Sequence, residues 1–116
     1  MKAEWWAEPC VCGRQFHNEA EAQLHMIVMQ GCGAAMIANK ANRFGATDRN
    51  VLNPTGPTNA ERLVAELNDL LAVSDMLAAV GVIPKDWRSM EAQDAKKAKV
   101  RKFVEYAKTK GAITDV

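Results

Sequence analysis

The long apolar segments of this chain repeat with the period of a helix, and no segment alternates with the period of a strand. Between about Asn18 and Arg43, apolar side chains return to one face when successive residues turn by about 100°. A strand that buries one face needs strict alternation instead. We therefore expect an all-α fold, an antiparallel helical bundle with essentially no sheet.

Turn-forming residues mark where the helices stop and start. Gly45 is expected to end the first helix, and segment 45–57 is rich in Asn, Gly and Pro, which break helices and build turns. Connections of this length without secondary structure are uncommon and often functional. Thr58 and Glu61 have the spacing of a capping box, so a second helix is expected from there to about Gly81.

A third helix is expected from about Asp86 or Ser89 to Lys110. Residues 1–17 contain turn residues and are interpreted as an irregular N-terminal arm. Because 116 residues is close to the usual size for one core, we expect residues 18–116 to form a single domain.

Composition excludes several classes of function. Hydrophobic residues make up 48% of the chain and the formal net charge is +1, which argues against disorder and against bulk attraction to double-stranded DNA. No apolar run is long enough to span a bilayer, so no membrane association is expected. Three cysteines without a recognisable export signal indicate free thiols and a cytoplasmic location.

Two carboxylates of the second helix form the first candidate site. Glu66 and Asp69 are three residues apart and so share one helical edge. Glu66 falls within the apolar arc, between Leu70 and Val73, where a charge is costly unless it is paired or metal-bound. Because Mg²⁺ prefers oxygen ligands, the pair is a candidate metal site. The alternative is two rim acids paired with basic residues of the third helix.

Four segments carry a resemblance to a known family. They are the stretches 40–45 (KANRFG), 58–63 (TNAERL), 66–73 (ELNDLLAV) and 95–100 (AKKAKV). In this order they resemble motifs of the MazG-like all-α nucleoside triphosphate pyrophosphohydrolases, in particular the short phage members. The resemblance covers about residues 24–113.

The resemblance implies a helical bundle that assembles as a homodimer or homotetramer. Active members convert nucleoside triphosphates to monophosphate and pyrophosphate with Mg²⁺ held by E-E-x-x-E on the first helix and E-x-x-D on the next. The first motif falls on Met29, Gln30 and Gly33, none of which is acidic. Only Glu66 and Asp69 remain as metal ligands.

We expect the first two helices to lie side by side, so that Gln30 and Gly33 face Glu66 and Asp69 across a gap the size of a phosphate. Gly33 then serves either a ligand or close helix packing. The basic third helix provides phosphate contacts or only a solvated face. No catalytic residue is assigned, and the residues assigned to a nucleotide are Gln30, Gly33, Lys40, Arg43, Asn59, Lys97 and Lys99.

The N-terminal arm offers two weaker signals. Trp5 and Trp6 have aromatic rings that can stack on a base or dock on another subunit. The spacing of the cysteines and histidines does not match a zinc finger, which leaves an irregular zinc site or free thiols as alternatives. The residues concerned are Cys10, Cys12, His17 and His25.

Three functions remain open. The first is a nucleotide-binding protein that no longer hydrolyses its ligand, for example a phage protein that sequesters a signalling nucleotide of host defence. The second is an active Mg²⁺-dependent pyrophosphohydrolase whose missing ligands come from elsewhere, for example from Glu61, Asp48 or another subunit. The third is a protein-interaction module that uses the helices only as a scaffold.

Overall fold

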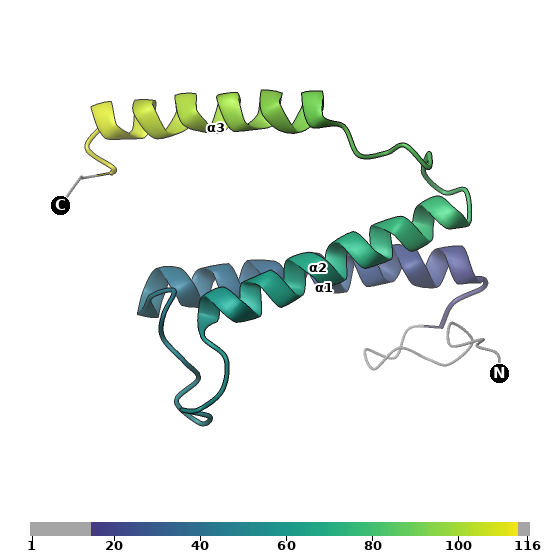
Figure 1. Cartoon of the computed structure of the whole chain (residues 1–116), viewed down its shortest axis with the longest axis horizontal. Helices are drawn as coiled ribbons and strands as arrows, with labels where there is room; N and C mark the ends of the chain where they lie inside the picture. The colour runs from purple at the N-terminus through teal and green to yellow at the C-terminus, as the bar shows by residue number, and fades with distance from the viewer. Residues whose placement is uncertain (1–14, 114–116) are drawn as a thin grey trace. The chain divides into compact units, whose positions relative to one another are not determined.

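The computed structural model of the protein describes residues 15–113 (Figure 1). It contains three α-helices, α1 (Glu19–Phe44), α2 (Asn59–Ala79) and α3 (Met90–Thr109). The only strand-like pairing in the described part is an isolated bridge between Arg49 and Thr58. The predicted all-α class is therefore confirmed. None of the described helices is both long enough and apolar enough to pass through a membrane.

The helix boundaries follow the capping signals of the sequence. Asn18 precedes α1, and its side-chain oxygen accepts a hydrogen bond from the Glu21 backbone N–H at 2.8 Å. Gly45 ends the same helix with a φ of 100°, a backbone conformation that residues with a side chain rarely adopt. Both hydrogen bonds of the capping box between Thr58 and Glu61 are present at the start of α2.

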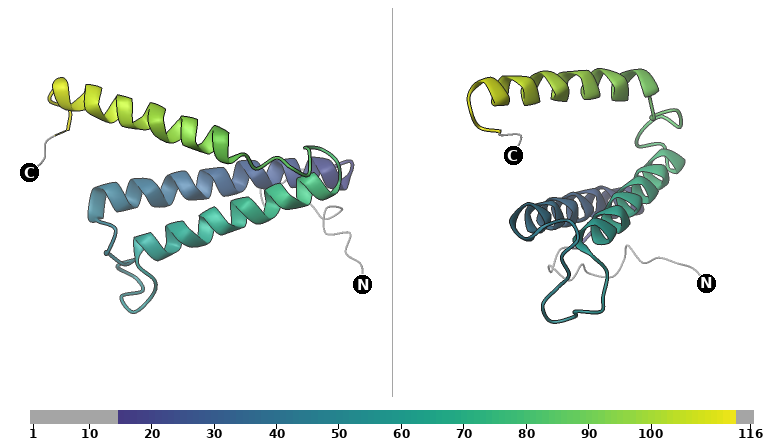
Figure 2. Two further views of the ribbon diagram at one scale, coloured as in Figure 1. Left: turned by 45° about the horizontal axis from the view of Figure 1, so that its top comes forward. Right: turned by 60° about the vertical axis from the view of Figure 1, so that its left-hand side comes forward.

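The chain divides into two compact units, residues 1–85 and residues 86–116. Within the first unit, α1 and α2 run antiparallel and pack against each other as a helical hairpin (Figures 1 and 2). Sequence reasoning placed residues 18–116 in one domain, whereas this division falls between α2 and α3.

The hairpin has a thin core. Its buried apolar side chains are Ala22, Ile37, Leu77 and Ala78. Larger apolar side chains on both helices, among them Val28, Met36 and Val64, remain mostly exposed. Helices usually bury apolar side chains, and association of two copies is one way to bury them. The homo-oligomer stays a prediction.

The second unit consists of α3 and the residues around it. Ser89 caps α3 by accepting a hydrogen bond from the Ala92 backbone N–H at 3.1 Å. The helix ends at Lys110, and Gly111 follows with φ 74°. No residue of α3 is buried.

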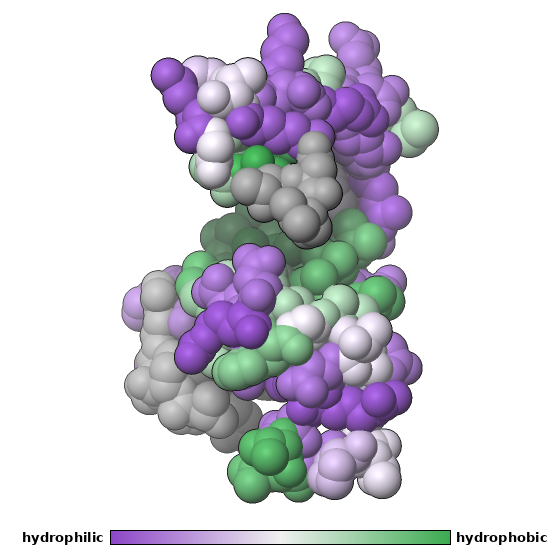
Figure 3. Space-filling model, turned by 90° about the vertical axis from the view of Figure 1, so that its left-hand side faces the viewer, coloured by the Kyte–Doolittle hydropathy of each residue, from purple (hydrophilic) through white to green (hydrophobic). Residues whose placement is uncertain are grey.

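The loop between α1 and α2 is ordered by its own hydrogen bonds. The Asn50 side-chain oxygen accepts from the Leu52 N–H at 2.9 Å, and the Asn50 carbonyl accepts from the Asn53 N–H at 2.8 Å. These turns leave Val51 and Leu52 87% and 89% exposed. Apolar surface shows at the lower end of the space-filling view, where this loop lies (Figure 3).

Candidate functional site

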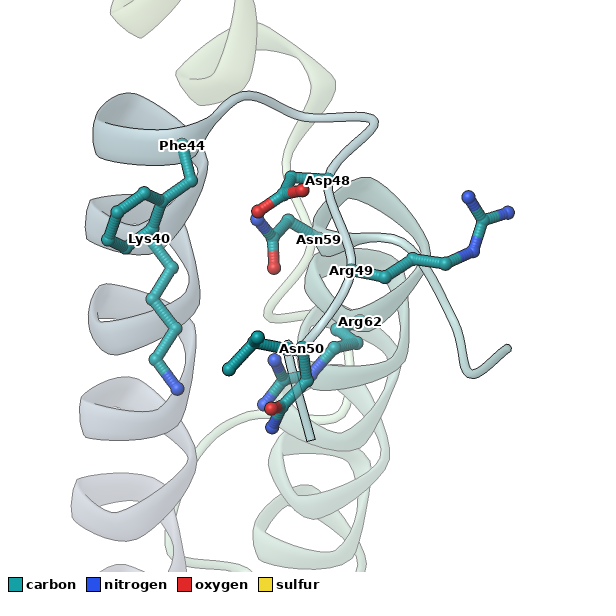
Figure 4. Close-up of a pocket in the computed structure, with 8 residues that line it drawn as sticks. Lys40, Phe44, Asp48, Arg49, Asn50, Asn59 and Arg62 are labelled. Carbon is teal, nitrogen blue, oxygen red and sulfur yellow. The ribbon is translucent and has the colours of Figure 1, made fainter. Parts of the chain in front are cut away.

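A cavity of about 280 Å³ lies at the loop end of the helical hairpin (Figure 4). The last turns of α1 form one wall, the loop closes the end, and the first turn of α2 forms the other wall. The lining residues are Lys40, Phe44, Asp48, Arg49, Asn50, Val51, Asn59 and Arg62. Two of the residues assigned to a nucleotide from the sequence, Lys40 and Asn59, therefore line the same cavity.

Asn59 holds this end of the hairpin together. Its side chain is buried, with 3% of its surface exposed, and its Nδ2 donates to the Gly45 carbonyl at 3.0 Å. Its backbone N–H donates to the Asp48 carbonyl at 2.8 Å, and the N–H of Ala60 donates to the Ala46 carbonyl at 2.9 Å. The cavity wall is thus fixed by bonds between the loop and α2.

The same bonds occupy the amides at the start of α2. The third N–H, that of Glu61, donates to the Thr58 hydroxyl at 3.2 Å. Free amides at a helix N-terminus often bind anions, but here loop carbonyls and the capping hydroxyl already accept from them. An anion in the cavity would therefore be bound by side chains.

Lys40 and Arg62 are the side chains suited to that role. Both are half-buried, and Figure 4 shows them extending from opposite walls toward the gap between α1 and α2. Neither has an ion-pair partner within residues 15–113. Arg49 points away from the gap, and its Nε donates to the Gly56 carbonyl at 2.9 Å (Figure 4).

Arg43, which was also assigned to the nucleotide from the sequence, does not line this cavity. It is exposed, and its guanidinium carbon lies 5.2 Å from the centre of the Phe44 ring. Phe44 lines the cavity while 60% of its surface remains exposed. An aromatic ring at a cavity mouth is a surface on which a planar group can stack.

Glu61 contributes to the start of α2 from outside the cavity. The Thr58 backbone N–H donates to Glu61 Oε1 at 3.0 Å. This bond, together with the Thr58 hydroxyl and the positive charge of Arg49, holds the pKa of Glu61 below its ordinary value. The carboxylate form is therefore the one that caps the helix.

Gly33 and Glu66 face each other, as expected, but no gap separates the two residues. A β-carbon at position 33 would lie 2.6 Å from Glu66 Oε2 and 2.9 Å from its Cδ. The Glu66 carboxylate thus fills the space that a side chain at position 33 would take. Glycine here allows the half-buried acid to rest directly on α1.

The other two residues of this predicted site differ in exposure. Gln30 is half-buried, whereas Asp69 is exposed. No group of three or more His, Cys, Asp or Glu residues in the described part of the chain is placed to hold a metal ion. Mg²⁺ is commonly bound by one or two carboxylates, while waters and substrate phosphates complete its octahedral shell. Magnesium binding stays a prediction.

Lys97 and Lys99 belong to the second unit, and their role as phosphate ligands also stays a prediction. The Lys97 ammonium lies 3.9 Å from an Asp94 carboxylate oxygen, a pair between two exposed residues one helical turn apart. The Lys99 ammonium lies 6.0 Å from the centre of the Phe103 ring. Both contacts are typical of a solvated helix face.

Sequence reasoning did not assign Arg62 or Phe44 to the site, and it considered Asp48 only as a substitute metal ligand. Phe44 and Arg62 lie inside the KANRFG and TNAERL segments, so the signal was present but was read only as a resemblance. Asp48 lies in the Asn- and Gly-rich loop, where the sequence does not indicate which loop residues lie next to which residues of the helices.

The predicted arm falls almost entirely outside the described residues. Trp5, Trp6, Cys10 and Cys12 lie outside them, so the zinc site and the docking or stacking role of the tryptophans stay predictions. Of the two histidines, His17 is exposed, and the His25 ring centre lies 5.2 Å from that of Phe16.

Comparison with known proteins leaves the cavity as the main guide to function. The chain matches no protein-family model, no curated protein and no solved structure. The resemblance to the MazG-like pyrophosphohydrolases therefore remains a prediction from short motifs.

Proposed function

We propose that this protein binds a nucleotide in the cavity at the loop end of the hairpin and does not hydrolyse it. The phosphate is placed between Lys40 and Arg62, whose side chains extend from α1 and α2 toward the same gap. The observation that carries the proposal is this pair of half-buried cations without an acidic partner among the described residues.

Electrostatics supports an anionic ligand. A half-buried charge loses part of its hydration, and an ionic partner compensates for that loss. Guanidinium and ammonium groups both bind phosphate oxygens, the first as a planar fork and the second as a point charge. The nearest acid in the cavity, Asp48, makes no ion pair with either cation within residues 15–113.

The proposal of binding without hydrolysis rests on the donors present. Metal-dependent phosphate chemistry needs ligands that hold the ion and orient water. On α2 the available acids are Glu66, which packs on Gly33, and the exposed Asp69. On α1 no acid follows Glu21, and Gln30 stands where the family motif has a carboxylate. Binding without turnover is what a protein that sequesters a nucleotide requires.

Calorimetric titration with nucleoside triphosphates, without a divalent metal, tests the proposal. Replacing either cation, in Lys40→Ala or Arg62→Ala, is expected to weaken binding about tenfold or more, because a charged hydrogen bond contributes about 1.5–3 kcal/mol. The matched controls are Lys96→Ala and Arg101→Ala, exposed cations of α3 that should leave the affinity unchanged.

Two results would contradict the proposal. One is an equal loss of affinity in the α3 controls, which would indicate nonspecific attraction. The other is Mg²⁺-dependent release of pyrophosphate that disappears in Glu66→Ala, which would establish the active hydrolase instead.

A further inference from the structure

The Asp48 carboxylate is the one feature of the cavity that does not suit a bare phosphate. Asp48 lines the cavity together with Lys40 and Arg62. In Figure 4 its carboxylate lies beside Asn59 and across the gap from Phe44, while the Lys40 ammonium and the Arg62 guanidinium lie toward the other end. The cavity thus has an acidic end and a cationic end.

The structure does not use this carboxylate to hold the loop. Asp48 is fixed through its backbone, whose carbonyl accepts from the Asn59 N–H at 2.8 Å and whose N–H donates to the Gly45 carbonyl at 3.3 Å. Its side chain makes no hydrogen bond or ion pair with any residue that the structure describes. Two carboxylate oxygens are therefore available as hydrogen-bond acceptors.

A ligand that satisfies both ends carries an anion at one end and hydrogen-bond donors at the other. On the α1 wall, across the gap from Asp48, the exposed ring of Phe44 offers a face for a planar group. A nucleotide has this arrangement, with a phosphate at one end and a base that stacks and presents polar edges at the other.

Resting on the nucleotide-binding function proposed above, we infer that the cavity selects guanine. The Watson–Crick edge of guanine presents two adjacent N–H donors, which match the two oxygens of one carboxylate. Adenine and cytosine place an acceptor nitrogen next to their amino group, and uracil flanks its single N–H with carbonyls. Each of these acceptors faces a carboxylate oxygen that cannot donate to it.

The size of the cavity limits the ligand to one nucleotide unit. Its volume of about 280 Å³ lies just below the range for small-molecule sites, which begins near 300 Å³. The ligand class is therefore a guanine mononucleotide, with its phosphate chain extending toward Lys40 and Arg62.

The test compares GTP, UTP and inorganic tripolyphosphate as ligands of the full chain in calorimetric titrations. The wild-type protein is expected to bind GTP about tenfold or more tightly than UTP, the scale of discrimination by a two-bond contact to a base edge. In Asp48→Asn, which keeps the size of the side chain, this preference should disappear. Tripolyphosphate affinity should stay the same or rise, because a repelling charge is removed.

Asp86→Asn is the matched control, because Asp86 is an exposed carboxylate outside the residues that line the cavity. It should retain the preference for GTP, and both variants should melt at the wild-type temperature. Equal affinity for GTP and UTP in the wild type, with tripolyphosphate still bound, would overturn the guanine inference alone. Failure of all three ligands to bind would overturn the proposed function as well.

Discussion

The middle of the helical hairpin and its loop end use the same two helices in opposite ways. In the middle, Gly33 lets α1 come so close to α2 that the Glu66 carboxylate rests on the α1 backbone. Two turns further along α1, or about 10 Å, Lys40 lines an open cavity with Arg62. Glu66, one of the two acids emphasised by the family resemblance, lies in the closed region, whereas two cations without an acidic partner among the described residues lie in the open one.

The proposed binding site and the closest packing of the helices therefore lie in separate parts of the contact between α1 and α2. A glycine without a β-carbon allows close approach and leaves little room for a ligand at that point. Long cationic side chains with no acidic partner leave a charge that a ligand can neutralise. The variants below test whether the two regions behave independently, beginning with the largest expected effect on stability.

Removing the buried amide of the loop end should have the largest effect. Asn59→Ala loses the bond from Nδ2 to the Gly45 carbonyl, which then keeps only the longer bond, at 3.3 Å, from the Asp48 N–H. We expect a loss of about 0.5–1.5 kcal/mol in the free energy of unfolding, measured by urea denaturation. The matched control is Asn68→Ala on α2, an exposed residue whose Nδ2 bonds the Val64 carbonyl within the same helix. A loss as large in the control would show that the loop end is not specially fixed.

The two glycines of α1 should respond differently to alanine. At Gly31 an added β-carbon meets nothing within 4 Å, so Gly31→Ala should stabilise the helix by up to about 1 kcal/mol. At Gly33 the same gain is opposed by displacement of the Glu66 carboxylate, so Gly33→Ala should stabilise less or destabilise.

A double-mutant cycle isolates this contact. In a Glu66→Ala background the obstruction is gone, and Gly33→Ala should then stabilise as Gly31→Ala does. Thermal unfolding of the four proteins in the cycle measures the coupling. Additive effects of the two substitutions would mean that Gly33 and Glu66 do not touch.

The smallest effect is the pH dependence of the capping box. The pKa of Glu61 in the folded protein is lowered, chiefly by the Thr58 backbone N–H, from an ordinary value of 4.5. The stabilisation is therefore fully present above pH 4.5 and is lost as the pH falls through the lower folded pKa. Glu61→Gln should melt below the wild type at neutral pH, and the difference should close in acid. A constant difference down to acid pH would contradict this origin.

Local signals in the sequence predicted the helices well. Asn18, Gly45, Thr58 and Ser89 act at the helix ends through bonds to neighbours a few residues away, so their roles follow from spacing alone. That Gly33 and Glu66 face each other was also expected, although across a gap and not in contact.

The cavity could not be predicted in the same way. Its shape depends on bonds between segments far apart in the sequence, such as Asn59 to Gly45 and Ala60 to Ala46. Lys40 and Asn59 were assigned from the resemblance, but nothing local indicated that Arg62 and Asp48 would join them. The phosphate-sized gap in the middle failed as an expectation because the Glu66 side chain turns onto the glycine that faces it.

A titration of the isotope-labelled protein with GTP, followed through its backbone amide NMR signals, tests the central claim most directly. We predict that the signals that move most are those of Lys40, Asp48, Asn59 and Arg62, while those of Gly33 and Glu66 move little. Largest shifts at Gly33 and Glu66, or no shifts at millimolar GTP, would contradict the claim that the loop-end cavity is the binding site.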